Sequence, residues 1–133
     1  MKNCSVIILA AGRSSRMGKP KYLLELDNGT PFLENIARQY EDFGIENIVV
    51  VLNSDGIFQM EKHPLNLTHK TQIALNQYPE YGRFYSIKTG LQFINTDFVF
   101  IHNVDNPMAK KKVLERIYDA IIEADVIKPI IDG

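Results

Sequence analysis

The sequence predicts an α/β fold of three layers, in which helices cover both faces of a mainly parallel sheet. Continuous apolar runs of strand length recur along the chain, as expected for strands that are buried on both faces. Segments with helical spacing of apolar residues separate these runs, and that alternation is typical of βαβ units. The 133 residues are 45% hydrophobic and 23% charged, and no linker divides them, so we expect a single domain over residues 1–133.

The first two strands and the helix between them are the clearest elements. Ser5–Leu9 and Asn47–Leu52 are nearly continuous apolar runs, which predict buried strands. Between them, Pro31–Tyr40 predicts a helix, since proline suits a first turn and Gly44 suits the end. The apolar residues at helical spacing in this segment are Phe32, Leu33, Ile36 and Tyr40.

The second half of the chain continues the alternation. In order, we expect a short helix over Ser54–Lys62, a weaker strand over Gln72–Leu75, a helix over Phe84–Ile94, a strand over Phe98–His102, a helix over Lys110–Ala124 and a last strand over Val126–Ile131. Pro129 falls within the last strand and lacks a backbone donor. We therefore expect that strand at an edge of the sheet, or distorted.

The first strand leads into a loop, residues 9–21, that predicts an anion site. The loop reads LAAGRSSRMGKPK and has no acidic residue; its basic residues are Arg13, Arg16, Lys19 and Lys21. Small residues let backbone N–H groups approach a ligand closely, while guanidinium and ammonium groups neutralise phosphate oxygens. A polyphosphate is the ligand that this loop favours.

Two common nucleotide-binding loops do not fit this segment. A P-loop has four residues between its glycines, whereas five separate Gly12 from Gly18. A P-loop lysine is also followed by Ser or Thr, whereas Pro20 follows Lys19. A dinucleotide-binding loop needs the glycines of G-x-G-x-x-G, which are missing, so a dinucleotide-dependent oxidoreductase is disfavoured.

The segment instead resembles the signature loop of MobA-like NTP transferases, a family with a glycosyltransferase-A-like sheet of the nucleotide-diphospho-sugar transferase kind. The matching residues are Leu9-Ala10-Ala11-Gly12, Ser14 or Ser15, Arg16-Met17-Gly18, Pro20-Lys21 and Leu23-Leu24 with Leu26. The similarity continues over residues 27–34 and, more loosely, at Asn76, Gly82, Ser86, Lys88 and Gly90-Leu91.

The resemblance implies a nucleotidyltransferase, which moves a nucleoside monophosphate from an NTP to a small-molecule acceptor and releases pyrophosphate. The acceptor it implies is a phosphate ester or a pterin-type cofactor. The implied nucleotide-binding residues are Leu9, Ala10, Ala11, Gly12, Arg13, Ser14, Ser15, Arg16, Lys21, Asn76, Gly82 and Ser86. Arg16 is expected to hold the β- and γ-phosphates and Lys21 the α-phosphate, which makes them the candidate catalytic residues. For Asn76, Gly82 and Ser86, capping or turn roles remain the alternative.

Asp105 is the candidate metal ligand. It follows the strand that ends near His102, and ligands of open α/β sheets gather beyond the carboxyl ends of the strands. The family carries an Asp in this turn as a ligand of Mg²⁺, although Asn106-Pro107 departs mildly from its pattern. The alternative is a turn or helix-capping role for Asp105.

Composition limits the partners. A formal net charge of −1 argues against a general nucleic-acid surface, and no apolar run approaches the ~18 residues of a membrane span. With no leader-like segment, we expect a cytoplasmic protein. Cys4 is expected to be a buried thiol, and the three histidines are expected to have surface or packing roles. Core and pocket-wall packing is expected for the aromatic residues Tyr78, Tyr81, Phe84 and Tyr85.

The sequence ends at Gly133, before any counterpart of the family's later strands and second metal-binding Asp. We therefore expect an NTP-binding domain that is incomplete at its C-terminus, with unpaired sheet edges that favour a homodimer. A nucleotidyltransferase is the first interpretation. A non-catalytic NTP-binding or regulatory domain that has lost the acceptor half is the alternative, and the sequence identifies neither the base nor the acceptor.

Overall fold

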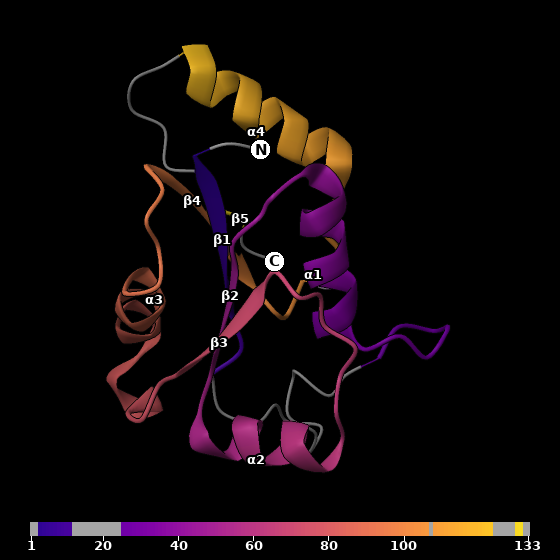
Figure 1. Cartoon of the computed structure of the whole chain (residues 1–133), viewed down its shortest axis with the longest axis vertical. Coiled ribbons are helices and arrows are strands. Elements are labelled where there is room, and N and C mark those ends of the chain that lie inside the picture. Colours follow the sequence, from indigo (N-terminus) through magenta and orange to yellow (C-terminus); the bar gives the residue numbers. More distant parts are fainter. Residues whose placement is uncertain (1–2, 12–24, 107, 124–129, 132–133) are drawn as a thin grey trace.

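The computed structural model of the chain describes residues 3–11, 25–106, 108–123 and 130–131, the last two and 121–123 by their backbone alone. Strands and helices alternate along it (Figure 1). The elements are β1 (Cys4–Leu9), α1 (Phe32–Phe43), β2 (Ile48–Leu52), α2 (Ser54–Lys62), β3 (Thr71–Leu75), the 3-10 helix η2 (Pro79–Tyr81), α3 (Arg83–Leu91), β4 (Phe98–Asn103), α4 (Lys111–Glu123) and β5 (Ile130–Ile131).

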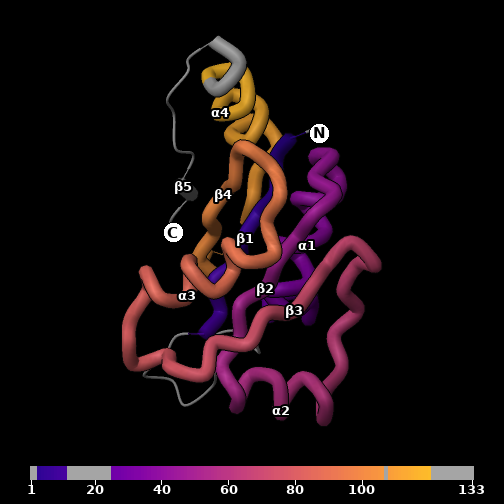
Figure 2. Tube along the Cα trace, turned by 60° about the vertical axis from the view of Figure 1, so that its left-hand side comes forward, coloured from indigo at the N-terminus to yellow at the C-terminus, as the bar shows by residue number. Residues whose placement is uncertain are grey.

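The described strands form one sheet in the order β3-β2-β1-β4-β5, and every pair is parallel. Ile7 in the central strand β1 lies opposite Val49 in β2 and Ile101 in β4. β2 and β3 follow on one side of β1, and β4 and β5 follow on the other side. Figure 2 shows β2 and β3 next to each other. The strand order therefore reverses between β1 and β4, where an open α/β sheet leaves a crevice for ligands.

Both faces of the sheet are covered, as Figure 1 shows with α1 and α3 on opposite sides. Alternate residues of β1 serve the two faces: Val6 and Ile8 belong to the larger core cluster, which includes α1 and α4, whereas Ile7 and Leu9 pack in a smaller cluster with Ile87 of α3. Because both faces are covered, all six residues of β1 are buried. The three-layer arrangement is the one that the sequence predicts.

Helix α1, predicted over Pro31–Tyr40, begins one residue later and ends three residues later, at the predicted stop before Gly44. Pro31 is the residue before its first turn, and Gly44 ends it with φ 109°, in the left-handed region that glycine adopts without strain. The Gly44 N–H donates to the carbonyl of Glu41 at 2.9 Å. The buried face of α1 is made by Leu33, Ile36, Ala37, Tyr40 and Phe43.

Two further sequence expectations need adjustment. The helix expected over Phe84–Ile94 begins at Arg83 and ends at Leu91. Of the last predicted strand, the structure assigns Ile130–Ile131 to β5, which lies at the sheet edge as Pro129 predicts. The remainder, residues 126–129, lies outside the described residues.

The aromatic residues around η2 depart from the predicted packing roles. Phe84 is 85% exposed and Tyr81 63% exposed. The described residues leave both side chains largely uncovered, and Tyr81 packs on neighbouring tyrosines. Tyr78 and Tyr81 stack with ring centroids 5.1 Å apart, and Tyr85 meets both rings edge-on.

The buried position predicted for Cys4 is confirmed, and burial raises the pKa of its thiol. Among the described residues, no helix has the length and apolar character needed to cross a membrane.

Gly90 is where α3 approaches the sheet most closely. A Cβ built there would lie 2.8 Å from Cγ2 of Ile7, a fully buried side chain of β1. We expect Gly90→Ala to destabilise the domain by about 1–3 kcal/mol through overpacking, measured by urea unfolding. Lys88→Ala, an exposed position on the same helix, is the control and should stay within about 0.5 kcal/mol. Equal stability of the two variants would contradict the close approach.

Candidate functional site

A cavity of about 210 Å³ lies at the carboxyl ends of β1 and β4, the point where the strand order reverses. Three short segments line it. The residues are Leu9, Ala10 and Ala11 at the end of β1, Pro79, Gly82, Arg83 and Ser86 from η2 to the first turn of α3, and Asn103 and Val104 at the end of β4. Segments that lie far apart in the sequence thus meet at the place where an α/β sheet binds its ligand.

Five of the predicted nucleotide-binding residues line this one cavity: Leu9, Ala10, Ala11, Gly82 and Ser86. The other predicted loop residues, Gly12, Arg13, Ser14, Ser15, Arg16 and Lys21, lie outside the described residues. Leu9–Ala11 lead directly into that loop, so the basic segment is attached at the rim of the cavity.

The backbone at the start of the loop is held by the neighbouring strands. Ala10 donates its N–H to the carbonyl of Val51 at 2.9 Å, and Val104 donates to the carbonyl of Leu9 at 3.0 Å. The Asn53 side chain donates to the carbonyl of Ala11 at 3.3 Å. Because the Ala10 N–H extends the pairing of the sheet, it is already used and is not the ligand donor that small loop residues suggest.

Asn76 supports the cavity rather than lining it. It is fully buried, and its Nδ2 donates to Ser86 Oγ at 2.8 Å. Its Oδ1 accepts from the Tyr78 N–H at 2.8 Å, and its own N–H donates to the carbonyl of Leu52 at 2.8 Å. Asn76 thereby ties the end of β2, the turn before η2 and the first turn of α3 together, which fixes the Ser86 hydroxyl at the cavity wall.

Gly82 has a backbone reason to be glycine. It precedes α3 with φ 93°, a conformation that side chains with a Cβ rarely adopt, and a Cβ placed there would meet nothing within 4 Å. Its residue type is therefore explained by the turn, while its position in the lining keeps the backbone close to any ligand.

Asp105 lies one residue beyond the cavity wall and is exposed. Its turn is closed by its neighbour, since the Asn106 N–H donates to the Asn103 carbonyl at 3.0 Å. Asn106 Oδ1 also accepts from the Met108 N–H at 3.3 Å.

The donor set suits a metal ion that arrives with phosphates. In the described part of the chain, no three His, Cys, Asp or Glu side chains gather that could hold an ion by themselves. Mg²⁺ bound to a nucleotide takes most of its ligands from phosphate oxygens and water and needs one or two carboxylates from protein. Asp105, next to the cavity, meets that requirement.

Sequence reasoning missed four lining residues: Pro79, Arg83, Asn103 and Val104. Arg83 is the most relevant of them, because it adds a guanidinium-bearing residue to the lining of the cavity. The sequence could have indicated Arg83, because it directly follows Gly82, which was already a candidate binding residue. For Asn103 the signal was its place at the end of the strand before Asp105.

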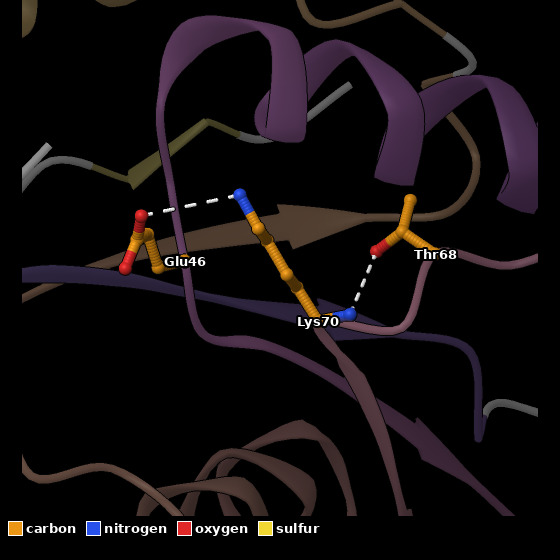
Figure 3. Close-up of polar contacts among 3 residues, drawn as sticks. All are labelled: Glu46, Thr68 and Lys70. Atoms are coloured by element: carbon orange, nitrogen blue, oxygen red, sulfur yellow. Dashed lines mark hydrogen bonds and ion pairs between the residues drawn. The ribbon is translucent and has the colours of Figure 1, made fainter.

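A second hollow, of about 470 Å³, lies near the opposite ends of the strands and includes His69 and Lys70. In Figure 3 dashed lines join the Lys70 ammonium to Glu46 Oε1 and the Lys70 N–H to Thr68 Oγ1. The ion pair measures 3.9 Å, and the N–H donates to the hydroxyl at 3.2 Å. A carboxylate beside the lysine offsets its attraction for anions, and an exposed ion pair of this kind adds little stability. The first cavity is therefore the candidate site.

Known proteins share both the sequence pattern and the fold. A family profile described as MobA-like NTP transferase domain matches residues 6–133. A probable molybdenum cofactor guanylyltransferase of Bacillus mycoides is 30% identical, over 100% of this chain and 64% of that protein. A 2-C-methyl-D-erythritol 4-phosphate cytidylyltransferase of Tolumonas auensis is 31% identical, over 90% of this chain and 52% of that protein.

The solved structure of 2-C-methyl-D-erythritol 4-phosphate cytidylyltransferase from Francisella tularensis matches with a TM-score of 0.68 and 25% identity. It covers 92% of this chain and 54% of that one, and it confirms the predicted α/β fold class. The chain thus spans between about half and two thirds of the length of these relatives. Because the family profile extends over nearly all of its residues, the chain belongs to the MobA-like NTP transferase domain family.

Proposed function

We propose that this chain is a nucleotidyltransferase that moves a nucleoside monophosphate from an NTP to a small-molecule acceptor and releases pyrophosphate. The observation that carries the proposal is the cavity at the reversal of the strand order. There the start of the basic loop, the first turn of α3 and the end of β4 converge, in a member of an NTP transferase family. The acceptor that we propose is a phosphate ester or a pterin-type cofactor.

The chemistry requires positioning and charge rather than covalent catalysis. The acceptor oxygen must lie in line with the α-phosphorus, and positive charge must surround the phosphoryl group while the pyrophosphate leaves. We assign Arg16 to the β- and γ-phosphates and Lys21 to the α-phosphate, where negative charge develops. Asp105 would hold Mg²⁺, which when bound neutralises phosphate oxygens.

The described residues suit the nucleoside end of such a ligand. Ser86 offers a hydroxyl that Asn76 holds in place, and Gly82 keeps the backbone open beside it. Arg83 adds a basic residue to the same wall. These contacts would orient the nucleotide so that its triphosphate extends toward the basic loop that follows Ala11.

We further propose that the protein acts in the cytoplasm, where NTPs are made, and that it forms a homodimer. The dimer is supported by β3, an edge strand on which Ile73 and Leu75 are exposed. A nucleic-acid partner is not proposed, since the formal net charge is −1.

Binding of an NTP is the first expected result. In a thermal-shift screen of four NTPs with and without Mg²⁺, the preferred nucleotide at about 100 times its Kd should stabilise the domain by roughly 2.7 kcal/mol. Mg²⁺ should increase the shift, because Asp105 would help to hold the ion and the ion would neutralise phosphate oxygens. If none of the four nucleotides raises Tm, the proposed function is wrong.

Turnover separates the proposal from the non-catalytic alternative. With the preferred NTP and Mg²⁺, pyrophosphate release should depend on an added acceptor, which a panel of sugar phosphates, alcohol phosphates and pterins would supply. A domain that only binds NTP would show the thermal shift and no acceptor-dependent release. A dinucleotide-dependent oxidoreductase has no support, because the family that matches is an NTP transferase family.

A further inference from the structure

The loop that follows β4, of which residues 104–106 and 108–109 are described, is held by polar side chains of α1 at its far end. Asn35 Nδ2 donates to Met108 Sδ at 3.5 Å, and Gln39 Oε1 accepts from the Ala109 N–H. One residue further along, the Tyr40 hydroxyl lies 2.8 Å from His102 Nδ1. Three positions of one helix thus make polar contacts with the end of β4 and with the loop that carries Asp105.

Of these three contacts, the one with His102 continues to Asn106, the residue next to Asp105 in the chain. His102 and Tyr40 are both fully buried, and His102 Nε2 lies 2.7 Å from the carbonyl oxygen of Asn106. A carbonyl can only accept, so Nε2 carries a hydrogen, and in the tautomer assigned on that basis Nδ1 accepts from the Tyr40 hydroxyl. Burial raises the pKa of Tyr40, which keeps that hydroxyl protonated and able to donate.

These hydrogen bonds fix the backbone on both sides of Asp105. Before it, the Val104 N–H is bound to the Leu9 carbonyl at 3.0 Å. After it, Asn106 is bound at both of its backbone polar groups, by the Asn103 carbonyl and by His102. Asp105 itself is exposed, and the backbone that carries its side chain is fixed by these neighbours.

We infer that Tyr40 and His102 are positioning residues, which hold the Asp105–Asn106 turn in the geometry that receives the nucleotide-bound metal ion. The inference rests on the proposed function, in which Asp105 is the metal ligand. A ligand held in place in advance loses less freedom when the ion binds, and residues that orient a ligand typically change metal affinity by about 10–100-fold.

The decisive variant is Tyr40→Phe, which removes one oxygen and leaves the ring packed against Phe100, whose centroid is 5.8 Å away. His102→Leu removes both hydrogen bonds, and His102→Gln retains an N–H donor for the Asn106 carbonyl. Ser5→Ala is the matched control, because Ser5 is also fully buried and its Oγ lies 2.8 Å from Thr96 Oγ1. Ser5 pairs with Val99 at the start of β4, far along the strand from His102.

Two measurements are made on each variant. The first is hydrogen exchange of the amides of residues 103–109 in the free protein. The second is the Mg²⁺ concentration that gives half of the metal-dependent thermal shift, with GTP and separately with CTP as the probe.

We expect Tyr40→Phe and His102→Leu to speed exchange in residues 103–109 and to raise the half-maximal Mg²⁺ concentration by about 10-fold. The shift with nucleotide alone should be unchanged. His102→Gln should bring the exchange rate and the Mg²⁺ midpoint back toward those of the native chain. Ser5→Ala should lower overall stability and leave the exchange rate and the Mg²⁺ midpoint unchanged. A merely structural pair would lower Tm and leave the metal midpoint where it was.

The inference is overturned if Tyr40→Phe leaves the exchange of residues 103–109 unchanged, or if exchange rises while the Mg²⁺ midpoint does not move. Because Tyr40→Phe keeps the aromatic ring, this result stands even if His102→Leu fails to fold. Failure of the proposed function has a different signature: no nucleotide shifts Tm, or Asp105→Asn leaves the midpoint unaltered in an otherwise native chain. The second of these also overturns the positioning role.

Discussion

Replacing Lys21 by alanine should reduce kcat by on the order of 10²–10³, the usual effect of removing one preorganised charge from a site of charge development. The α-phosphate gains negative charge as the acceptor attacks, and Lys21 is the residue that we assign to it. An interaction that strengthens in the transition state affects kcat more than KM. Steady-state pyrophosphate release at saturating NTP and acceptor measures the effect.

Lys19→Ala is the matched control for Lys21, because it removes the same charge from the same loop at a position with no assigned role. It should reduce kcat far less. Urea unfolding should show both variants within about 0.5 kcal/mol of the native stability. Equal kcat values for Lys21→Ala and the native chain would remove Lys21 from the mechanism.

The fold could be predicted because its strands are covered on both sides. β1 and β2 are buried at every position, and that produces the continuous apolar runs from which a parallel sheet is recognised. The sequence pattern of β3 was weaker because this strand is not covered on both sides. It lies at the edge, and only Ala74 and, in part, Thr71 are covered, so its composition is mixed. The start of α3 was missed by one residue because the positive φ of Gly82 sets it, and a sequence does not display φ.

The site could be predicted only where a local pattern marks it. Leu9–Ala11 and Asp105 follow strands, and Gly82 and Ser86 fall at a helix start, so each has a signal within a few residues. The hydrogen bond between Tyr40 and His102 joins residues 62 positions apart. Tyr40 fits the apolar face of a helix and His102 the end of a strand, and their partnership depends on α1 packing over β4. Pairings of this kind follow from the fold and not from the sequence pattern.

Replacing Asp105 by asparagine should raise the Mg²⁺ concentration needed for half-maximal turnover by on the order of 10²-fold. Residues that only orient a metal ligand change metal affinity by about 10–100-fold, and a direct ligand contributes more than the residues that orient it. We therefore take the upper end of that range. Asparagine keeps the size of the side chain and an acceptor oxygen, so the loss reports the charge. A titration of Mg²⁺ at fixed NTP, followed by pyrophosphate release, gives the midpoint.

Asp97→Asn makes the same change of charge at the opposite end of the strand that leads to Asp105. Asp97 precedes β4 and lies beside Asn3, with its N–H bound to Asn3 Oδ1 at 2.8 Å, a contact that the substitution retains. Its Mg²⁺ midpoint should match that of the native chain. A general effect of lowering the negative charge would move both midpoints alike, whereas a metal site at the carboxyl end of β4 moves only that of Asp105→Asn. If the two titrations coincide, Asp105 is a turn residue and the metal ion is bound elsewhere.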